Sequence, residues 1–234
     1  LENDPDCAMA HWGVSYASGP NYNLPWILYD PAGKAQALRE SYDAMQRALA
    51  AAVNATPVEQ ALIRALQARY PQRDAIEDQA PWDKAFTVEM RKLFRAWPDD
   101  LEVRSVFAEA IMNEMPWQMW DLRTGRATEG AGTDEAVEVL ESALRDLPAS
   151  WDHPGLLHLY IHLMEMSPFP QRALRAADRL RDLVPDSGHL IHMPTHIDVL
   201  CGNYRDVVVY NQKAVVADAK FLAREGAMNF YTLY

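Results

Sequence analysis

Histidines are concentrated in one part of this 234-residue chain, and their spacing is that of ligands carried on helices. The chain has seven histidines, and six of them lie between residues 153 and 196. His158, His162 and Glu165 are separated by four and three residues, which places them on one face of a helix. The other positions from 156 to 166 are apolar or aromatic, and a helix that is apolar nearly all round is buried. Such a polar stripe must face partners, because buried ionisable groups are costly unless they are satisfied.

A second histidine stripe follows about one repeat later in the chain. His189, His192 and His196 are separated by three and four residues, and most of their neighbours are apolar. The last two each lie 34 residues after a histidine of the first stripe. Pro194 either kinks this helix or marks its beginning, in which case the entering segment carries the first two histidines.

Matched pairs of histidines on neighbouring helices have the composition of a metal site. Packed helices lie about 8–10 Å apart, so imidazoles from both helices reach one ion. Nitrogen donors with one carboxylate suit a divalent transition metal, namely zinc, iron, copper or manganese. We expect Glu165 to be a fifth ligand or a general base, with His189 supporting the ligands. The predicted metal ligands are His158, His162, His192 and His196.

Other interpretations of the histidines stay open. They also fit a structural hydrogen-bond ladder, or the duplication of one repeat without a function. The metal hypothesis includes a metal-dependent hydrolase or oxygenase acting on a small molecule in a groove. The alternative function is a non-catalytic scaffold whose groove binds a peptide, although the stripe has few of the Asn, Lys and Arg residues that suit a peptide backbone. Metal analysis of the purified protein separates these two classes.

Two further polar residues are candidates for the same groove. Glu109 and Asn113 are four apart on a helix predicted over Leu101–Met115, and they extend the polar stripe into the neighbouring repeat. A surface glutamate and a helix-end asparagine are the plainer interpretations.

An insertion lengthens the unit that follows this helix. The segment Pro116–Gly132 contains Trp117 and Trp120 and a stretch rich in glycine and threonine. Insertions in repeat proteins usually lie on one face, so we predict that the two tryptophans lie near the mouth of the groove. A loop that is merely pinned by two tryptophans is the alternative.

The remaining two histidines lie outside the stripes. His153 precedes Pro154 and Gly155, which predicts a helix cap or a turn. His11 lies on a predicted first helix, distant in sequence from the others.

The elements that carry these residues are predicted to be helices throughout. Apolar residues recur at three and four from Ala8 to Leu222, and no segment alternates as a strand does. The 34-residue period is that of tetratricopeptide repeats. We therefore predict an all-α, tetratricopeptide-type solenoid of helical hairpins, forming one domain over residues 1–234. The segments Leu1–Pro5 and Asn229–Tyr234 indicate that the array is part of a longer one.

Composition excludes several kinds of partner. The 33 acidic residues exceed the 22 basic ones, and the resulting net charge of −11 argues against nucleic acid and anionic membrane surfaces. No apolar run approaches the length of a membrane span. Cys7 and Cys201 are too few for a disulfide framework and are predicted to be buried, which favours a cytoplasmic location.

The chain resembles, along its whole length, a group of bacterial and fungal tetratricopeptide-repeat proteins. The resemblance implies the solenoid fold and a ligand groove along the inner face of the first helices, and it implies no particular reaction. Members of the group look longer at both ends. The stretches that carry it are Asp4-Pro5-Asp6-Cys7-Ala8-Met9-Ala10-His11-Trp12-Gly13, Gly19-Pro20-Asn21-Tyr22-Asn23, Met115-Pro116-Trp117, His153-Pro154-Gly155 with His158, Tyr160-Ile161-His162 and Glu165, and Gly188-His189-Leu190-Ile191-His192-Met193-Pro194 with His196.

Overall fold

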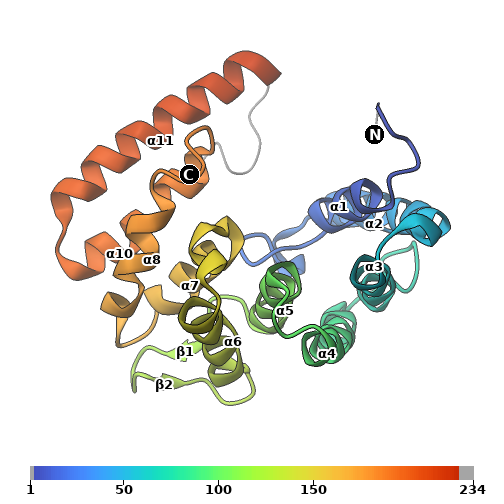
Figure 1. The fold of residues 1–234 in the computed structure, drawn as a ribbon, viewed down its shortest axis with the longest axis horizontal. Coiled ribbons are helices and arrows are strands. Elements are labelled where there is room, and N and C mark those ends of the chain that lie inside the picture. The colour runs from blue at the N-terminus through green and yellow to red at the C-terminus, as the bar shows by residue number, and fades with distance from the viewer. Residues whose placement is uncertain (1–2, 227–234) are drawn as a thin grey trace. The chain divides into compact units, whose positions relative to one another are not determined.

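The computed structural model describes residues 3–226, and they are mostly helical (Figure 1). The prediction of an all-α fold is confirmed, whereas the tetratricopeptide type stays a prediction. The helices divide into two compact units, Leu1–Trp117 and Gln118–Tyr234. A single array over residues 1–234 stays a prediction, and the end segment Asn229–Tyr234 lies outside the described residues.

Unit 1 is a succession of helices in which each packs against the next. Short 3₁₀ turns at Trp26–Leu28 and Ala52–Asn54 flank the second helix. Asp30 caps that helix with its carboxylate, and Thr56 with Glu59 forms a capping box at the start of the third, so both helices begin with satisfied backbone donors. The helices are α1 (Ala8–Ser18), α2 (Pro31–Ala51), α3 (Pro57–Arg69), α4 (Ala80–Ala96) and α5 (Leu101–Glu114).

Unit 1 also contains a buried arginine at its centre. The side chain of Arg69 is 1% exposed, and its Nη2 donates to the carbonyl of Pro20 at 2.9 Å. Its Nε lies 3.7 Å from a carboxylate oxygen of Asp83. The guanidinium also lies over the rings of Tyr16 and Phe86. Burial raises the pKa of Asp83 to about 6, although Arg69 acts in the opposite direction. A charge network therefore lies where the apolar periodicity predicted only core.

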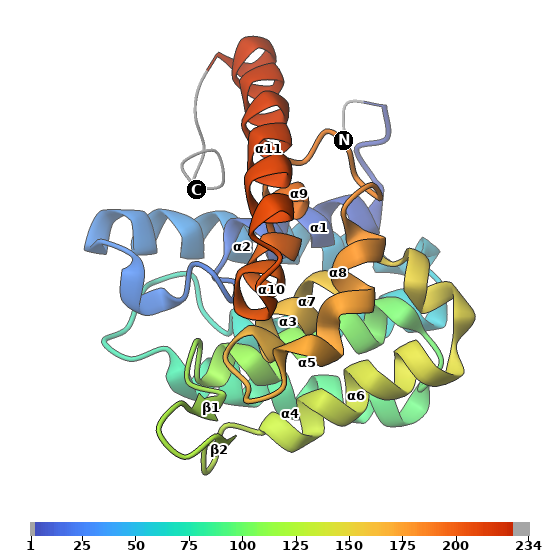
Figure 2. The ribbon, with the colours of Figure 1, turned by 90° about the vertical axis from the view of Figure 1, so that its left-hand side faces the viewer.

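Unit 2 begins with a small hairpin and continues as paired helices. The strands fall inside the predicted insertion and pair antiparallel, an element that the sequence did not predict. α7 packs against both α8 and α10, and α11 runs beside α9 and α10 (Figure 2). The elements are β1 (Trp120–Asp121), β2 (Arg126–Ala127), α6 (Thr133–Asp146), α7 (Pro154–Glu165), α8 (Leu174–Leu180), α9 (Gly188–His192), α10 (Pro194–Cys201) and α11 (Tyr204–Glu225), with 3₁₀ turns at Pro148–Asp152 and Pro170–Ala173.

α7 is the buried helix that the sequence predicts. His153 caps it by accepting the backbone N–H of Leu156, as the cap interpretation expected. Most of its apolar positions are buried, and of its polar residues His162 is buried while His158 and Glu165 are partly exposed. Nearby, Arg181 donates twice to Asp198, at 2.7 Å each, and this buried pair ties the segment after α8 to α10.

The prediction that the two cysteines are buried is wrong. Cys7 and Cys201 are both free thiols of intermediate exposure. Cys7 precedes the first residue of α1, and Cys201 is the last residue of α10. Both therefore lie at helix ends, where the chain turns toward solvent. None of the helices formed by residues 3–226 combines the length and apolar character needed to cross a membrane.

Candidate metal centre

Five imidazoles and one carboxylate meet where α7 packs against the segment α9–α10. The ring centroids of His158 and His162 are 4.6 Å apart, and those of His192 and His196 are 4.7 Å apart. His162 and His196 join the two pairs with a centroid distance of 6.0 Å. His189 completes the group at 5.1 Å from His158. The structure thus gathers both predicted stripes into one cluster.

The two stripes meet through contacts of two spacings. Nε2 of His158 lies 3.1 Å from Nε2 of His189, and Glu165 contacts His196, so both of these pairs are separated by 31 residues. The rings of His162 and His196 also lie close together, and these two residues are separated by the 34 residues of the repeat period. The contacts therefore follow the repeat period only in part. Pro194 is the first residue of α10, so it marks the beginning of a helix, which is the second of the two interpretations of this proline.

Glu165 holds two histidines in one tautomer. Its carboxylate accepts from Nδ1 of His162 at 3.0 Å and from Nδ1 of His196. Burial acts to raise the pKa of this carboxyl, but the two hydrogen bonds outweigh burial and lower the pKa to about 2. Glu165 is therefore ionised at neutral pH and can only accept, so Nδ1 of each ring carries the proton that it donates. A base of such low pKa is weak at neutral pH, so this geometry favours an orienting role over the general-base role.

Asn211 does the same for a third histidine. Nδ1 of His192 lies 2.6 Å from Oδ1 of Asn211, whose Nδ2 donates to the carbonyl of Val207 at 2.8 Å. A carbonyl only accepts, so the amide orientation is fixed and His192 must donate from Nδ1. Asn211 is not among the site residues predicted from the sequence. The available signal was an asparagine in the middle of a long helix, where asparagine is a poor helix former.

Two groups of side chains within the described residues have the geometry to hold a metal ion. In each group the ligand atoms all lie within 4.8 Å of one another. The first group contains three imidazoles and the second contains a carboxylate. His192, a predicted ligand, belongs to neither, whereas His189, predicted as a supporting residue, belongs to the first. The groups are His158 with His162 and His189, and His162 with Glu165 and His196.

Two imidazoles of the first group are held neutral by their surroundings. Burial, reinforced by the neighbouring imidazoles, lowers the pKa of His158 well below its usual value and lowers that of His189 to about 3. Neutral imidazole is the form that binds metal ions. His158 and His189 therefore offer neutral nitrogen donors at physiological pH.

The same pKa shifts predict acid sensitivity of the metal-free protein. Histidines in the unfolded chain protonate below about pH 6.5, whereas folded His158 and His189 stay neutral. The unfolded state then binds more protons, so the free energy of unfolding falls as the pH falls below 6.5, by about 1.4 kcal/mol per pH unit and histidine. Denaturant unfolding in chelator at pH 7 and pH 5 measures this loss. His189→Asn is expected to flatten the pH dependence, and an unchanged slope in that variant would contradict the prediction.

The predicted groove residues of α5 lie in unit 1. Glu109 accepts from the hydroxyl of Tyr16, and Asn113 is buried. The histidine cluster lies in unit 2, so the extension of its stripe to these two residues stays a prediction.

The two tryptophans of the insertion fall in different units. Trp117 packs edge-on against Tyr22 in unit 1 and has a positive φ of 57°. Trp120 starts β1 in unit 2, and its Nε1 donates to the carbonyl of Leu163 at 2.7 Å. Trp120 is thus hydrogen-bonded to the helix that carries the first stripe, while the position of both tryptophans near the mouth of the groove stays a prediction.

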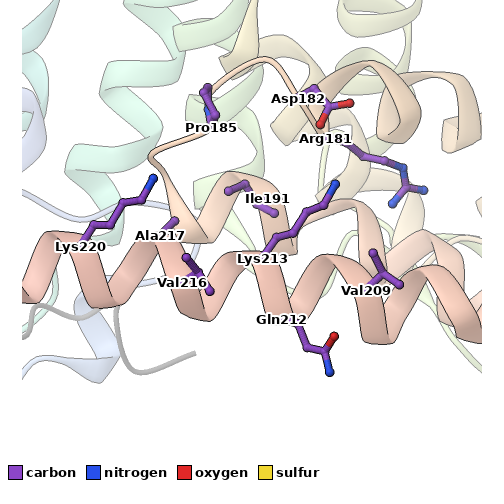
Figure 3. Close-up of a pocket in the computed structure, with 10 residues that line it drawn as sticks. All are labelled: Arg181, Asp182, Pro185, Ile191, Val209, Gln212, Lys213, Val216, Ala217 and Lys220. Carbon is purple, nitrogen blue, oxygen red and sulfur yellow. The ribbon is translucent and has the colours of Figure 1, made fainter.

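A separate pocket of unit 2 is lined by residues of α11 and by Ile191 of α9. It has a volume of about 440 Å³, and Lys213 and Lys220 of α11 border it (Figure 3). None of its lining residues is a histidine, so it is distinct from the cluster. The lining residues are Arg181, Asp182, Pro185, Ile191, Val209, Gln212, Lys213, Val216, Ala217 and Lys220.

Comparisons with known proteins found no family model, no curated protein and no solved structure that matches this chain. The resemblance to tetratricopeptide-repeat proteins therefore stays a prediction.

Proposed function

We propose that unit 2 binds a divalent transition metal through the imidazoles of His158, His162 and His189. The observation that carries this proposal is the convergence of three imidazole donors within 4.8 Å of one another. The Nε2 atoms of His158 and His189 are 3.1 Å apart. With nitrogen–metal bonds of about 2.0–2.1 Å, that separation corresponds to a ligand angle of about 100°. Such an angle lies between octahedral and tetrahedral geometry.

The surroundings of the donors support the same proposal. Metal-binding histidines usually donate their other N–H to a carboxylate or a carbonyl, which fixes the tautomer. Glu165 accepts from Nδ1 of His162 in this way. Three imidazole nitrogens suit zinc best, and iron, copper and manganese belong to the same class.

Three protein ligands leave a coordination position for water or substrate. A metal in such a setting lowers the pKa of bound water toward neutrality, so the reaction class that we propose is metal-dependent hydrolysis of a small molecule. Glu165 would act as a positioning residue, because its carboxylate already accepts two imidazole protons.

The tetratricopeptide architecture is part of the proposal. α7 with α8, and α9–α10 with α11, pack as successive hairpins, and the first elements α7 and α10 also contact each other. First helices that pack side by side line one surface in repeat proteins. The histidine cluster is carried by these first elements, which supports a groove lined by histidine and glutamate.

Metal analysis tests the function directly. Protein purified without chelator or affinity tag is expected to contain a transition metal, or to bind added Zn²⁺ in a calorimetric titration. His162→Asn or His189→Asn is expected to weaken metal binding by more than about 100-fold. Loss of an orienting partner alone weakens binding by at most about that factor, whereas each of these variants loses a ligand. His11→Asn in unit 1 is the matched control and is expected to bind as the wild type does. If no metal is found and none can be added, the proposal fails and a peptide-binding scaffold becomes the leading function.

A further inference from the structure

His192 and His196 face each other in a way that two neutral imidazoles cannot satisfy. Their Nε2 atoms are 2.8 Å apart. Asn211 takes the Nδ1 proton of His192, and Glu165 takes that of His196. A neutral imidazole has only one N–H, so both facing Nε2 atoms carry lone pairs. Two lone pairs at this distance repel, and a cation between them removes the repulsion.

We propose that this cation is a second divalent transition metal, held by Nε2 of His192 and of His196, so that the cluster is a dinuclear centre. This inference rests on the proposed function, because the first metal is the one bound by the three-imidazole group. With bonds of about 2.0–2.1 Å, a separation of 2.8 Å corresponds to a ligand angle of about 86°. That angle suits adjacent ligands of an octahedral or square-planar metal, whose other positions water occupies.

The orienting groups of the second position are as complete as those of the first. Asn211 is itself fixed by Val207 and Thr195, and it holds the ring of His192 with its lone pair toward His196. Glu165 serves both positions, because one oxygen accepts from His162 and the other from His196. One carboxylate therefore connects the two metal positions through hydrogen bonds. At each position it accepts the N–H of a metal-binding histidine, which is the usual role of a carboxylate beside such a ligand.

The first experiment counts the metal ions. Equilibrium dialysis of the full chain against Zn²⁺, followed by elemental analysis, is expected to give two ions per chain for the wild type. Asn211→Ala removes no proposed ligand. It is expected to weaken the binding of the ion held by His192 and His196 by about 10–100-fold, while the ion of the three-imidazole group stays bound. His189→Asn is expected to weaken the binding of the ion of the three-imidazole group instead. Gln212→Ala, at the next position of α11 and exposed, is the matched control and should bind two ions.

The outcomes separate this inference from the proposed function. No bound ion in the wild type overturns both. One ion that is lost in His189→Asn and unaffected in Asn211→Ala overturns the second metal alone, and a proton then lies between His192 and His196. A second measurement needs no variant: wild-type protein loaded with Cu²⁺ is expected to show a spin-coupled electron paramagnetic resonance spectrum. The spectrum of an isolated ion at full loading would overturn the dinuclear centre.

Discussion

Zinc is expected to raise the free energy of unfolding of the wild-type protein by about 4 kcal/mol when free Zn²⁺ is at a thousandfold excess over its dissociation constant. The donors come from α7 and from α9, so they converge only in the folded state. A ligand that binds the folded state and not the unfolded one stabilises the fold by this linkage. The His162→Ala variant is expected to gain clearly less than the wild type, because it lacks a donor of the three-imidazole group.

Urea unfolding of each variant with zinc and with chelator measures the gain in the free energy of unfolding that zinc causes. The comparison is made within each variant, so the cost of the vacancy left by a side chain that is 3% exposed cancels. His11→Ala is the control, since that histidine lies in unit 1, bonds to the Pro5 carbonyl and belongs to neither metal-holding group. An equal gain in His162→Ala and the wild type would show that zinc acts elsewhere in the protein.

Local periodicity was enough to predict the helices that carry the cluster. The apolar run from 156 to 166 predicted a buried helix, and α7 covers Pro154–Glu165. The polar residues at 158, 162 and 165 were correctly placed on one face, because a spacing of three and four fixes a helical face whatever the helix packs against. Proline before glycine also predicted the start of α7, where His153 is the cap.

Pairing between the helices could not be predicted in the same way. The 34-residue period relates equivalent positions of two repeats, but contacts depend on how far the helices slide past each other. The structure places His189 against His158, although the residue that follows His158 by 34 positions is His192. Asn211 lies on a third helix, and only the packing of α11 beside α9 brings it to His192. Tertiary packing of this kind leaves no periodic trace in the sequence.

The charge network of unit 1 was missed for a related reason. Arg69 is the last residue of α3, where a basic residue interacts favourably with the negative end of the helix dipole. Asp83 lies in the first turn of α4, where an acidic residue is equally ordinary. Each residue type is ordinary for its own helix end, and nothing local in the sequence shows that both side chains turn inward.

Arg69→Met is expected to lower the free energy of unfolding by about 3–5 kcal/mol, the usual cost of removing one partner of a buried ion pair. Methionine fills much of the same volume, so the loss comes mainly from the carboxylates that remain. Asp83 would lose the cation that opposes the effect of its burial, and Glu109, which also interacts with Arg69, would lose a favourable neighbour.

Arg73→Met provides the matched control for this substitution. Arg73 makes two 2.9 Å hydrogen bonds to Asp43, but its side chain is 51% exposed and that of Asp43 is 39% exposed. An exposed pair contributes little to stability because water and salt screen it, so the control should unfold nearly as the wild type does. A double variant, Arg69→Met with Asp83→Leu, is expected to recover part of the loss because it removes the stranded charge. If the double variant is less stable than Arg69→Met alone, packing and not charge makes Arg69 necessary, and the role assigned here to the ion pair is wrong.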